Sequence, residues 1–377
     1  MSKELKSGYT TGTCATVAAL VALDLLLKKE LEDSCILTTL NGTTIEVPIK
    51  SKKRLGSWAR GVVIKDAGDD PDVTNGIEIC AKVKIIDELP DVKKAHRFNN
   101  ILLVGGRGVG VATKKGLKVE PGKSAINPGP QEMIVKALTE LLEKYGMNHT
   151  KLLVYIYVPK GREKALKTFN GKLGILGGIS ILGSTGIVKP MSEEALQNSM
   201  FAELKVLKEN SDRDWVLFLF GNHGKQFCID NNIDIEQSVV TSNFIGFMID
   251  SAVKLGFKKI MLIGHIGKAI KVAGGVFNTH SRVADARLEI IAANAVLIDE
   301  PRENILKVLE SNTAEEACEY ISKKAELFNL VANKVAKRSS EFSRDTIEFE
   351  AVLFNYKGDI LGSSDGFYKM VEELRGE

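Results

Sequence analysis

The spacing of hydrophobic residues in the first half of the chain predicts mostly β-strands. Short runs that resemble β-strands occupy residues 35–40, 44–49, 58–65, 77–86 and 152–158. Small apolar residues follow Thr10-Thr11-Gly12-Thr13 and predict a closely packed helix that begins at the threonines. A second helix is expected over 131–145, because Asn127-Pro128 suits a helix start. This half is therefore expected to form an α+β domain.

The pattern changes near residue 171, where short apolar strands begin to alternate with long amphipathic segments. Strands are predicted over 175–182, 215–220 and 259–263, and helices over 192–209, 237–255 and 280–295. Strands that alternate with helices pair in parallel and carry helices on both faces of the sheet. We therefore expect two domains, an α+β domain over 1–170 and a three-layer α/β/α domain over 171–377. A charged helical stretch over 314–341 and a last strand over 346–355 complete the second domain and suggest no function.

Three glycine-containing loops follow the predicted parallel strands, at 183–186, 221–224 and 264–267. Ligands of parallel sheets bind at the carboxyl ends of the strands. All three loops are therefore expected at one rim of the second domain.

The composition is that of an ordinary globular protein. Of 377 residues, 44% are hydrophobic and 26% charged, and the net charge of +3 gives no sign of a nucleic-acid partner or a polybasic membrane anchor. The five scattered cysteines form no CxxC pair, which favours a reducing cytoplasm. The apolar run after Thr16 contains Asp24 and is interpreted as a helix rather than a signal peptide, and no segment resembles a transmembrane helix.

Several familiar catalytic patterns are missing. Gly264-His-Ile-Gly-Lys268 lacks the glycine spacing and the Ser/Thr of a P-loop, and GGRGVG at 105–110 is one residue short of a dinucleotide fingerprint. His265, His280 and Asp285 are too irregularly spaced for a metal motif, and no metal site is predicted. Cys14 lies in a run of small residues and fits a packed helix better than a catalytic nucleophile.

Glycine, hydroxyl groups and single cations at the loop tips favour an anionic ligand. Glycine lets backbone N–H groups approach a ligand closely, and a helix N-terminus adds partial positive charge. Such loops are also common as tight connections, so each alone leaves both interpretations open. The stretch 264–282 combines four glycines, two lysines and two histidines, and indicates the rim of a site for a large polyanion.

Eight segments, in order and nearly from end to end, resemble the cobalt-precorrin-5B C-1 methyltransferases of the anaerobic cobalamin pathway. They are SGYTTGTCATVAA (7–19), KDAGDDPDVTNG (65–76), GGRGVGVATKKGL (105–117), AINPGPQEMI (125–134), GGISILGSTGIVKPMS (177–192), GNHG (221–224), SNFIGFMIDSAVKLGF (242–257) and GHIGKAIKVAGGVFNTHSRVADAR (264–287). The resemblance implies methyl transfer from S-adenosylmethionine to C-1 of a cobalt-containing macrocycle, giving cobalt-precorrin-6A. It also implies an N-terminal unit like a permuted GHMP-kinase-type fold and a C-terminal three-layer unit with a parallel sheet.

We assign candidate site residues from the loops and this resemblance. His265 and His280 are expected to handle a proton or anchor the ligand, since neutral imidazole can do either near pH 7. The expected partners of the macrocycle's carboxylates and rim are Lys268, Lys271, Arg282, Ser281, Arg107, Thr10, Thr11 and Thr13. The expected contacts of S-adenosylmethionine are Gly183, Ser184, Thr185, Gly186, Asn222, His223, Asp66 and Asp69, although the aspartates suit a turn equally well. A tetrapyrrole carrier without methyl transfer and a small-molecule phosphotransferase remain alternatives, and self-association is left open.

Overall fold

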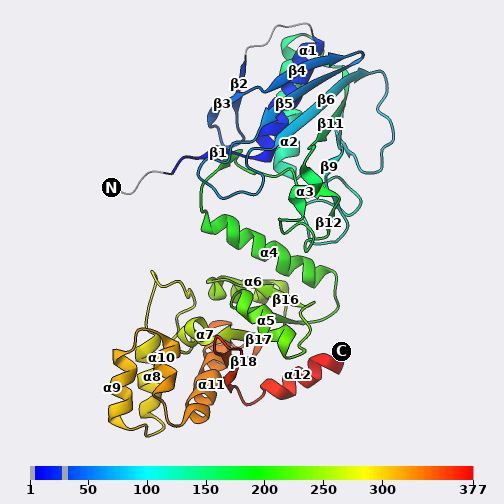
Figure 1. Ribbon diagram of the computed structural model, residues 1–377. Helices are drawn as coiled ribbons and strands as arrows, with labels where there is room; N and C mark the ends of the chain where they lie inside the picture. The colour runs from blue at the N-terminus through cyan, green and yellow to red at the C-terminus, as the bar shows by residue number, and fades with distance from the viewer. Residues whose placement is uncertain (1–4, 28–32, 377) are drawn as a thin grey trace. The chain divides into compact units, whose positions relative to one another are not determined.

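The computed structural model describes residues 5–27 and 33–376, and the chain divides into two compact units, Met1–Glu193 and Glu194–Glu377 (Figure 1). The expected division after residue 170 would separate three short strands from the first unit. These strands, β12 (Ile175–Leu176), β13 (Gly178–Ile179) and β14 (Ile187–Val188), pair instead with strands of the first unit, the first two with strands at 108–112 and the third with Gly8–Tyr9. The predicted parallel strand over 175–182 is therefore wrong, because the positive φ of Gly177 (83°) bends this segment.

The first unit is built on a mixed six-stranded sheet. Its strand order is β4-β5-β6-β11-β8-β7, with β11 and β8 parallel and the other pairs antiparallel. The bounds are β4 Ser51–Leu55, β5 Trp58–Ile64, β6 Glu78–Ile86, β7 His96–Arg97, β8 Ile101–Gly105 and β11 Lys151–Tyr157. Four two-stranded pairs surround it, β1-β14, β9-β13, β10-β12 and β2-β3, with β1 Gly8–Tyr9, β2 Ser34–Thr38, β3 Thr44–Pro48, β9 Gly108–Val109 and β10 Val111–Ala112.

Two helices, α1 (Thr11–Leu26) and α2 (Pro128–Lys144), pack with the sheet of the first unit in one hydrophobic core. The small residues of α1 let its backbone come close to β5, where a Cβ on Gly61 would collide with the carbonyl oxygen of Ala18. Pro128 occupies the first turn of α2, as expected. A short helix, α3 (Gly161–Ala165), follows β11.

The second unit has a five-stranded sheet of order β16-β15-β17-β18-β19, whose last strand alone is antiparallel. The bounds are β15 Trp215–Leu219, β16 Ser238–Val240, β17 Lys259–His265, β18 Glu348–Phe354 and β19 Ile360–Ser363. The helices are α4 Glu193–Glu209, α5 Asn222–Asp230, α6 Ile245–Leu255, α7 Ile266–Ala273, α8 Arg287–Val296, α9 Arg302–Glu310, α10 Ala314–Glu319, α11 Lys324–Phe342 and α12 Phe367–Gly376.

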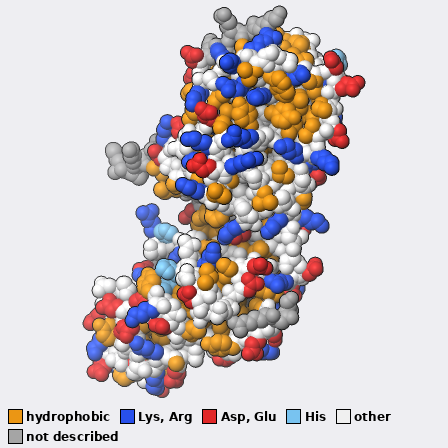
Figure 2. Space-filling model, turned by 45° about the vertical axis from the view of Figure 1, so that its right-hand side comes forward, with side chains coloured by type: hydrophobic (Ala, Val, Ile, Leu, Met, Phe, Trp, Pro, Cys, Tyr) orange, Lys and Arg blue, Asp and Glu red, His pale blue; other side chains and the backbone are white. Residues whose placement is uncertain are grey.

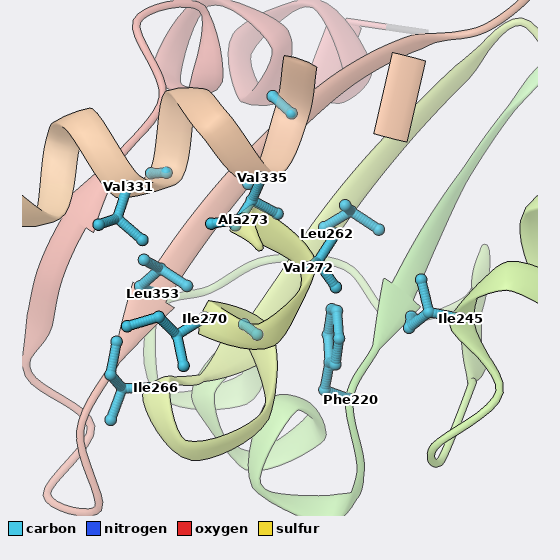
Figure 3. Packing of buried hydrophobic residues seen from close by; sticks show 14 of the residues in the cluster. Phe220, Ile245, Leu262, Ile266, Ile270, Val272, Ala273, Val331, Val335 and Leu353 are labelled. Carbon is cyan, nitrogen blue, oxygen red and sulfur yellow. The ribbon is translucent and has the colours of Figure 1, made fainter. Parts of the chain in front are cut away.

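Alternate residues of β15, β17 and β18 enter two separate cores, which makes the second unit three layers thick. On one face, residues such as Phe218 and Leu262 pack with α6, α7 and α11. On the other, residues such as Leu217 and Met261 pack with Phe227 of α5 and with α12. Figure 3 shows the first core, where side chains of α7 and α11 point toward Leu353 of β18. The expected parallel α/β/α architecture is present in this unit.

Three predicted helices of the second unit are shorter than expected. The segment 237–255 begins with strand β16, since Ser238, Val239 and Val240 favour extended backbone, and α6 starts only at Ile245. Residues 280–286 form a turn before α8, and 314–341 contains two helices, α10 and α11. Among residues 5–27 and 33–376, no helix is both long and apolar enough to span a membrane.

Candidate functional site

In the second unit, the carboxyl ends of β15, β17 and β18 bring three loops to one edge of the sheet. Leu219 pairs with Ile263 and His265 pairs with Phe354, so the three strands end side by side. The segments 221–224 and 264–267 lie at the ends of β15 and β17, as predicted, but α5 already begins at Asn222, and 264–267 comprises the end of β17 and the start of α7. The loop at 183–186 belongs to the first unit, so its expected place at this rim was wrong.

Three rings gather at this edge and define what we call the carboxyl-end cluster: His223, His265 and Tyr356. The ring centroids of His265 and Tyr356 are 4.0 Å apart, those of His223 and Tyr356 5.5 Å, and those of the two histidines 6.1 Å. His223 and Tyr356 are exposed, and Tyr356 follows β18 directly. The cluster therefore presents aromatic surface beside the open N-terminus of α5.

Both ring nitrogens of His265 are already bonded within the protein. Its Nδ1 accepts the backbone N–H of Gly267 at 3.1 Å, which caps α7, and its Nε2 donates to Glu315 Oε1 at 2.6 Å. Burial lowers the pKa of His265, and the Glu315 carboxylate opposes this without reversing it. The ring is thus held neutral with its proton on Nε2. Of the two expected roles, this geometry favours the polar anchor over the proton acceptor.

Glu315 was missed by sequence reasoning, because it lies in α10, far along the chain from the histidines. Its Oε1 also accepts the backbone N–H of Tyr356 at 3.0 Å, so one carboxylate fixes two members of the cluster. Tyr356 could have been found, since it stands at the carboxyl end of a predicted strand. The sequence offers no comparable signal for Glu315.

The two lysines of α7 have different environments. Lys271 is 2% exposed, and its Nζ donates to the carbonyl oxygens of Thr279 (3.1 Å) and Ala284 (2.8 Å). This geometry favours a structural role for Lys271 over the predicted carboxylate contact, because the lysine holds the loop after α7. Burial lowers the pKa of Lys268, and this lysine lies close enough to His265 to lower the histidine pKa. Lys268 remains a candidate for an anion at the cluster.

The loop that contains His280 is held by bonds of its own. His280 Nδ1 accepts the backbone N–H of Arg282 at 3.1 Å, and the His280 backbone N–H donates to Asn278 Oδ1. Ser281 and Arg282 are exposed. None of the hydrogen bonds found for His280 within the described part of the chain reaches the carboxyl-end cluster.

In the first unit Thr10, Thr11 and Thr13 lie against the 182–186 segment and form a corner whose hydroxyls face the protein. Thr10 caps α1 by accepting the Thr13 N–H, and Thr13 Oγ1 donates to the Gly186 carbonyl at 2.6 Å. Thr11 Oγ1 bonds both backbone groups of Leu182, at 3.2 and 2.9 Å. The three threonines are at most 5% exposed. This geometry favours a structural role over the predicted contact with the macrocycle, since the threonines tie the helix start to the 183–186 loop.

The remaining predicted residues of the first unit lie in two places. Asp66 and Asp69 hold the N-terminal segment, since Asp66 pairs with Lys6 Nζ at 3.1 Å and Asp69 accepts the Lys6 backbone N–H at 2.7 Å. The Gly68 N–H and Lys6 lower the pKa of Asp66. This geometry favours their turn role over ribose binding, whereas Ser184 and Thr185 stay exposed beside the corner. Arg107 is exposed and lines a groove of about 550 Å³ with aromatic residues of the sheet.

No group of three or more His, Cys, Asp or Glu able to hold a metal ion occurs within residues 5–27 and 33–376.

The chain is similar to known proteins over nearly its whole length. The CbiD family model matches residues 1–190, and the model of the CbiD C-terminal domain matches residues 278–365. A relative from Fusobacterium nucleatum named cobalt-precorrin-5B C(1)-methyltransferase is 54% identical over 98% of both chains. A relative of the same name from Methanocaldococcus jannaschii is 42% identical over 96% of this chain and 97% of its own.

A crystal structure of a cobalamin biosynthesis protein (cbiD) from Archaeoglobus fulgidus is 28% identical and covers 76% of this chain and 84% of that chain, with a TM-score of 0.39. The family model and the two full-length relatives are sufficient for an assignment. The chain belongs to the CbiD family.

Proposed function

We propose that the chain transfers the methyl group of S-adenosylmethionine to C-1 of cobalt-precorrin-5B, giving cobalt-precorrin-6A in cobalamin biosynthesis. The observation that carries this proposal is the 54% identity, over 98% of both chains, to a relative named for the reaction. The methyltransferase class follows from the family. The methyl donor and the residues that hold donor and macrocycle are our inference.

The donor is placed at the carboxyl-end cluster. Asn222 and His223 open α5 at the carboxyl end of β15, where backbone N–H groups and the helix dipole favour a carboxylate such as that of the methionyl group. Lys268 supplies a nearby cation. A sulfonium is attracted to the faces of aromatic rings, and the exposed rings of His223 and Tyr356, which meet edge to face with centroids 5.5 Å apart, offer aromatic surface at this place.

The transfer itself needs alignment more than acid or base. The S–CH₃ bond breaks as the new C–C bond forms, and S-adenosylhomocysteine leaves. Positioning reacting atoms about 3–3.5 Å apart can supply much of the rate of such a displacement. The displacement requires no covalent nucleophile from the protein.

The proposal includes two finer assignments. The first unit is a permuted GHMP-kinase-type fold, as the resemblance implies. The protein works in the cytoplasm, which is in keeping with five cysteines that are all free thiols.

The test uses the full chain, cobalt-precorrin-5B and methyl-labelled S-adenosylmethionine. The parent protein should add one labelled methyl group to the macrocycle and should give heat on calorimetric titration with S-adenosylmethionine. A carrier would bind the macrocycle without the donor, and a phosphotransferase would instead hydrolyse nucleotide with magnesium.

Tyr356→Ala tests the placement of the donor. The side chain is 67% exposed, so its loss should leave the fold intact and weaken donor binding by roughly tenfold. Tyr368→Ala, at a 58% exposed tyrosine of α12, is the matched control and should bind as the parent does. Equal donor affinity in the two variants would show that the donor does not bind at the carboxyl-end cluster. Methyl transfer by the parent protein would still support the proposed function in that case.

A further inference from the structure

On one face of the six-stranded sheet in the first unit, residues of 89–95 pack over Leu102 and Leu153, and the uncovered part combines aromatic with basic side chains. In the strand register, Arg60 of β5 lies opposite Lys82 of β6, which lies opposite Tyr155 of β11. The next row contains Trp58 opposite Lys84. Neighbouring strands are about 4.8 Å apart, so these rows form a continuous surface across three strands. We call it the open sheet face.

The aromatic rings of this face line a groove. The rings of Trp58 and Tyr155 are 5.7 Å apart, Lys82 Nζ lies 5.6 Å from the ring centre of Tyr157, and Lys84 Nζ lies 5.9 Å from that of Trp58. The groove of about 550 Å³ is lined by these three aromatic residues, Lys82, Arg107, Gly106 and Leu55. A flat apolar ligand could therefore lie against the rings while its edge meets the cations.

The charged residues that line the groove are of one sign. No Asp or Glu lines the groove, and within the described part of the chain Lys82, Lys84 and Arg107 form no ion pair with a carboxylate. The Nε atom of Arg60 is buried without a hydrogen-bond partner. Cations usually alternate with acids on protein surfaces, so this arrangement indicates an external anion. Figure 2 shows hydrophobic side chains bordered by Lys and Arg on the surface of the chain.

We propose that the open sheet face binds the macrocycle substrate, with the conjugated ring against Trp58, Tyr155 and Tyr157 and its acetate and propionate groups paired with Lys82, Lys84 and Arg107. This inference rests on the proposed function, because the substrate class comes from it. Aromatic surface with cations can also hold single-stranded nucleic acid. The chain's net charge of +3, with 48 acidic residues, favours a compact polycarboxylate over a long polyphosphate.

The two tryptophans of the chain provide a local readout. Trp58 lies in the groove, whereas Trp215 is 3% exposed in a core of the second unit. In a Trp215→Phe protein all tryptophan emission comes from Trp58, and titration with uroporphyrin, a macrocycle rimmed by carboxylates, should quench it strongly. In a Trp58→Phe protein the remaining emission should be quenched much less at the same occupancy, measured by equilibrium dialysis. Equal quenching in the two proteins would overturn the proposal.

Charge removal tests the polar part of the contact. The variant Lys82→Gln/Lys84→Gln/Arg107→Gln should bind uroporphyrin about tenfold more weakly and with a smaller salt dependence. Lys136→Gln/Lys144→Gln on α2 is the control, matched in unit and chemistry, and should bind as the parent does. Unchanged affinity in the triple variant, or displacement of the porphyrin by an equal concentration of oligothymidylate, would refute the proposal.

Turnover separates this inference from the proposed function. If the parent protein transfers no methyl group to cobalt-precorrin-5B, the proposed function itself is refuted. If the parent transfers the methyl group and the triple variant has an unchanged KM for the macrocycle, only the proposed docking site is refuted. The expected result is a raised KM in the triple variant, with the melting temperature kept.

Discussion

The buried ion pair between Lys65 and Asp72 allows a sharp prediction about stability. Lys65 follows β5 and is 2% exposed, and its Nζ lies 2.6 Å from Asp72 Oδ2, whose side chain is 26% exposed. Asp72 also accepts hydrogen bonds from the N–H and the hydroxyl of Thr74, at 2.7 and 2.6 Å. Lys65 therefore depends on Asp72 for its counter-charge in this pair, whereas Asp72 has further hydrogen bonds and partial contact with water.

Asp72→Asn should destabilise the first unit more than Lys65→Met does. The asparagine leaves a fully buried ammonium without its counter-charge, which costs about 3 kcal/mol in comparable pairs. Lys65→Met removes the buried charge and keeps the length of the side chain, while Asp72 retains Thr74 and partial contact with water. We expect a loss of about 1–2 kcal/mol for this variant.

Urea unfolding in the Trp215→Phe background measures this difference, because Trp58 then reports on the first unit. The Asp72→Asn midpoint should be the lower of the two, with an unchanged slope. Lys136→Met is a control for loss of an exposed lysine, 60% exposed in its side chain, and should change the midpoint little. A Lys65→Met protein as unstable as Asp72→Asn, or less stable, would refute the reasoning from unequal burial.

Three further predictions concern other polar contacts. Lys271→Met should destabilise the second unit by about 2 kcal/mol, because the carbonyl oxygens of Thr279 and Ala284 lose their donor. The same variant should speed amide exchange over 279–286, whereas Lys268→Met should leave that exchange unchanged. Gly183→Ala should lower the first-unit melting temperature, since φ is 126° and a Cβ would collide with Thr10; unchanged melting would contradict this. The folded pKa of His265 lies below its unfolded value of about 6.5, so the associated stability should be complete above that pH and fall away below it. His265→Asn, which keeps an acceptor for the helix start, should flatten the dependence of second-unit stability between about pH 7.5 and 5.5, and an unflattened curve would reject it.

Local sequence signals predicted the regular elements that depend on nearby residues. The threonines before the small-residue helix gave the start of α1, and apolar runs gave β15 and β17. The failures lie where distant partners decide the backbone. Residues 175–182 were predicted as one strand of the parallel sheet, but they pair with β9 and β10 in the first unit, and nothing in their own composition indicates those partners.

The candidate site shows the same division. The carboxyl-end rule correctly placed His223 and His265 at one edge, because parallel pairing alone brings those loops together. It could not reveal Glu315, which reaches His265 from α10. The open sheet face went unnoticed because its aromatic and basic residues alternate with core residues along β6 and β11. Only their place on neighbouring strands brings Lys82, Tyr155 and Tyr157 together, and the sequence does not show that pairing.

Whether a polar side chain can serve a ligand depends on its remaining hydrogen-bonding capacity more than on its chemical type. Thr13 and Lys271 have the chemistry of anion contacts, yet their groups are satisfied by backbone carbonyls and are unable to bind a ligand without unfolding the loops that they hold. Lys82 and Lys84 lie over aromatic rings and pair with no carboxylate of the described chain. An external carboxylate can bind them without breaking an internal contact, so binding there should be fast, sensitive to salt and almost neutral for the fold. A ligand that required Thr13 or Lys271 would instead bind slowly and loosen the protein, and the two mechanisms can be separated by comparing association rates with amide exchange.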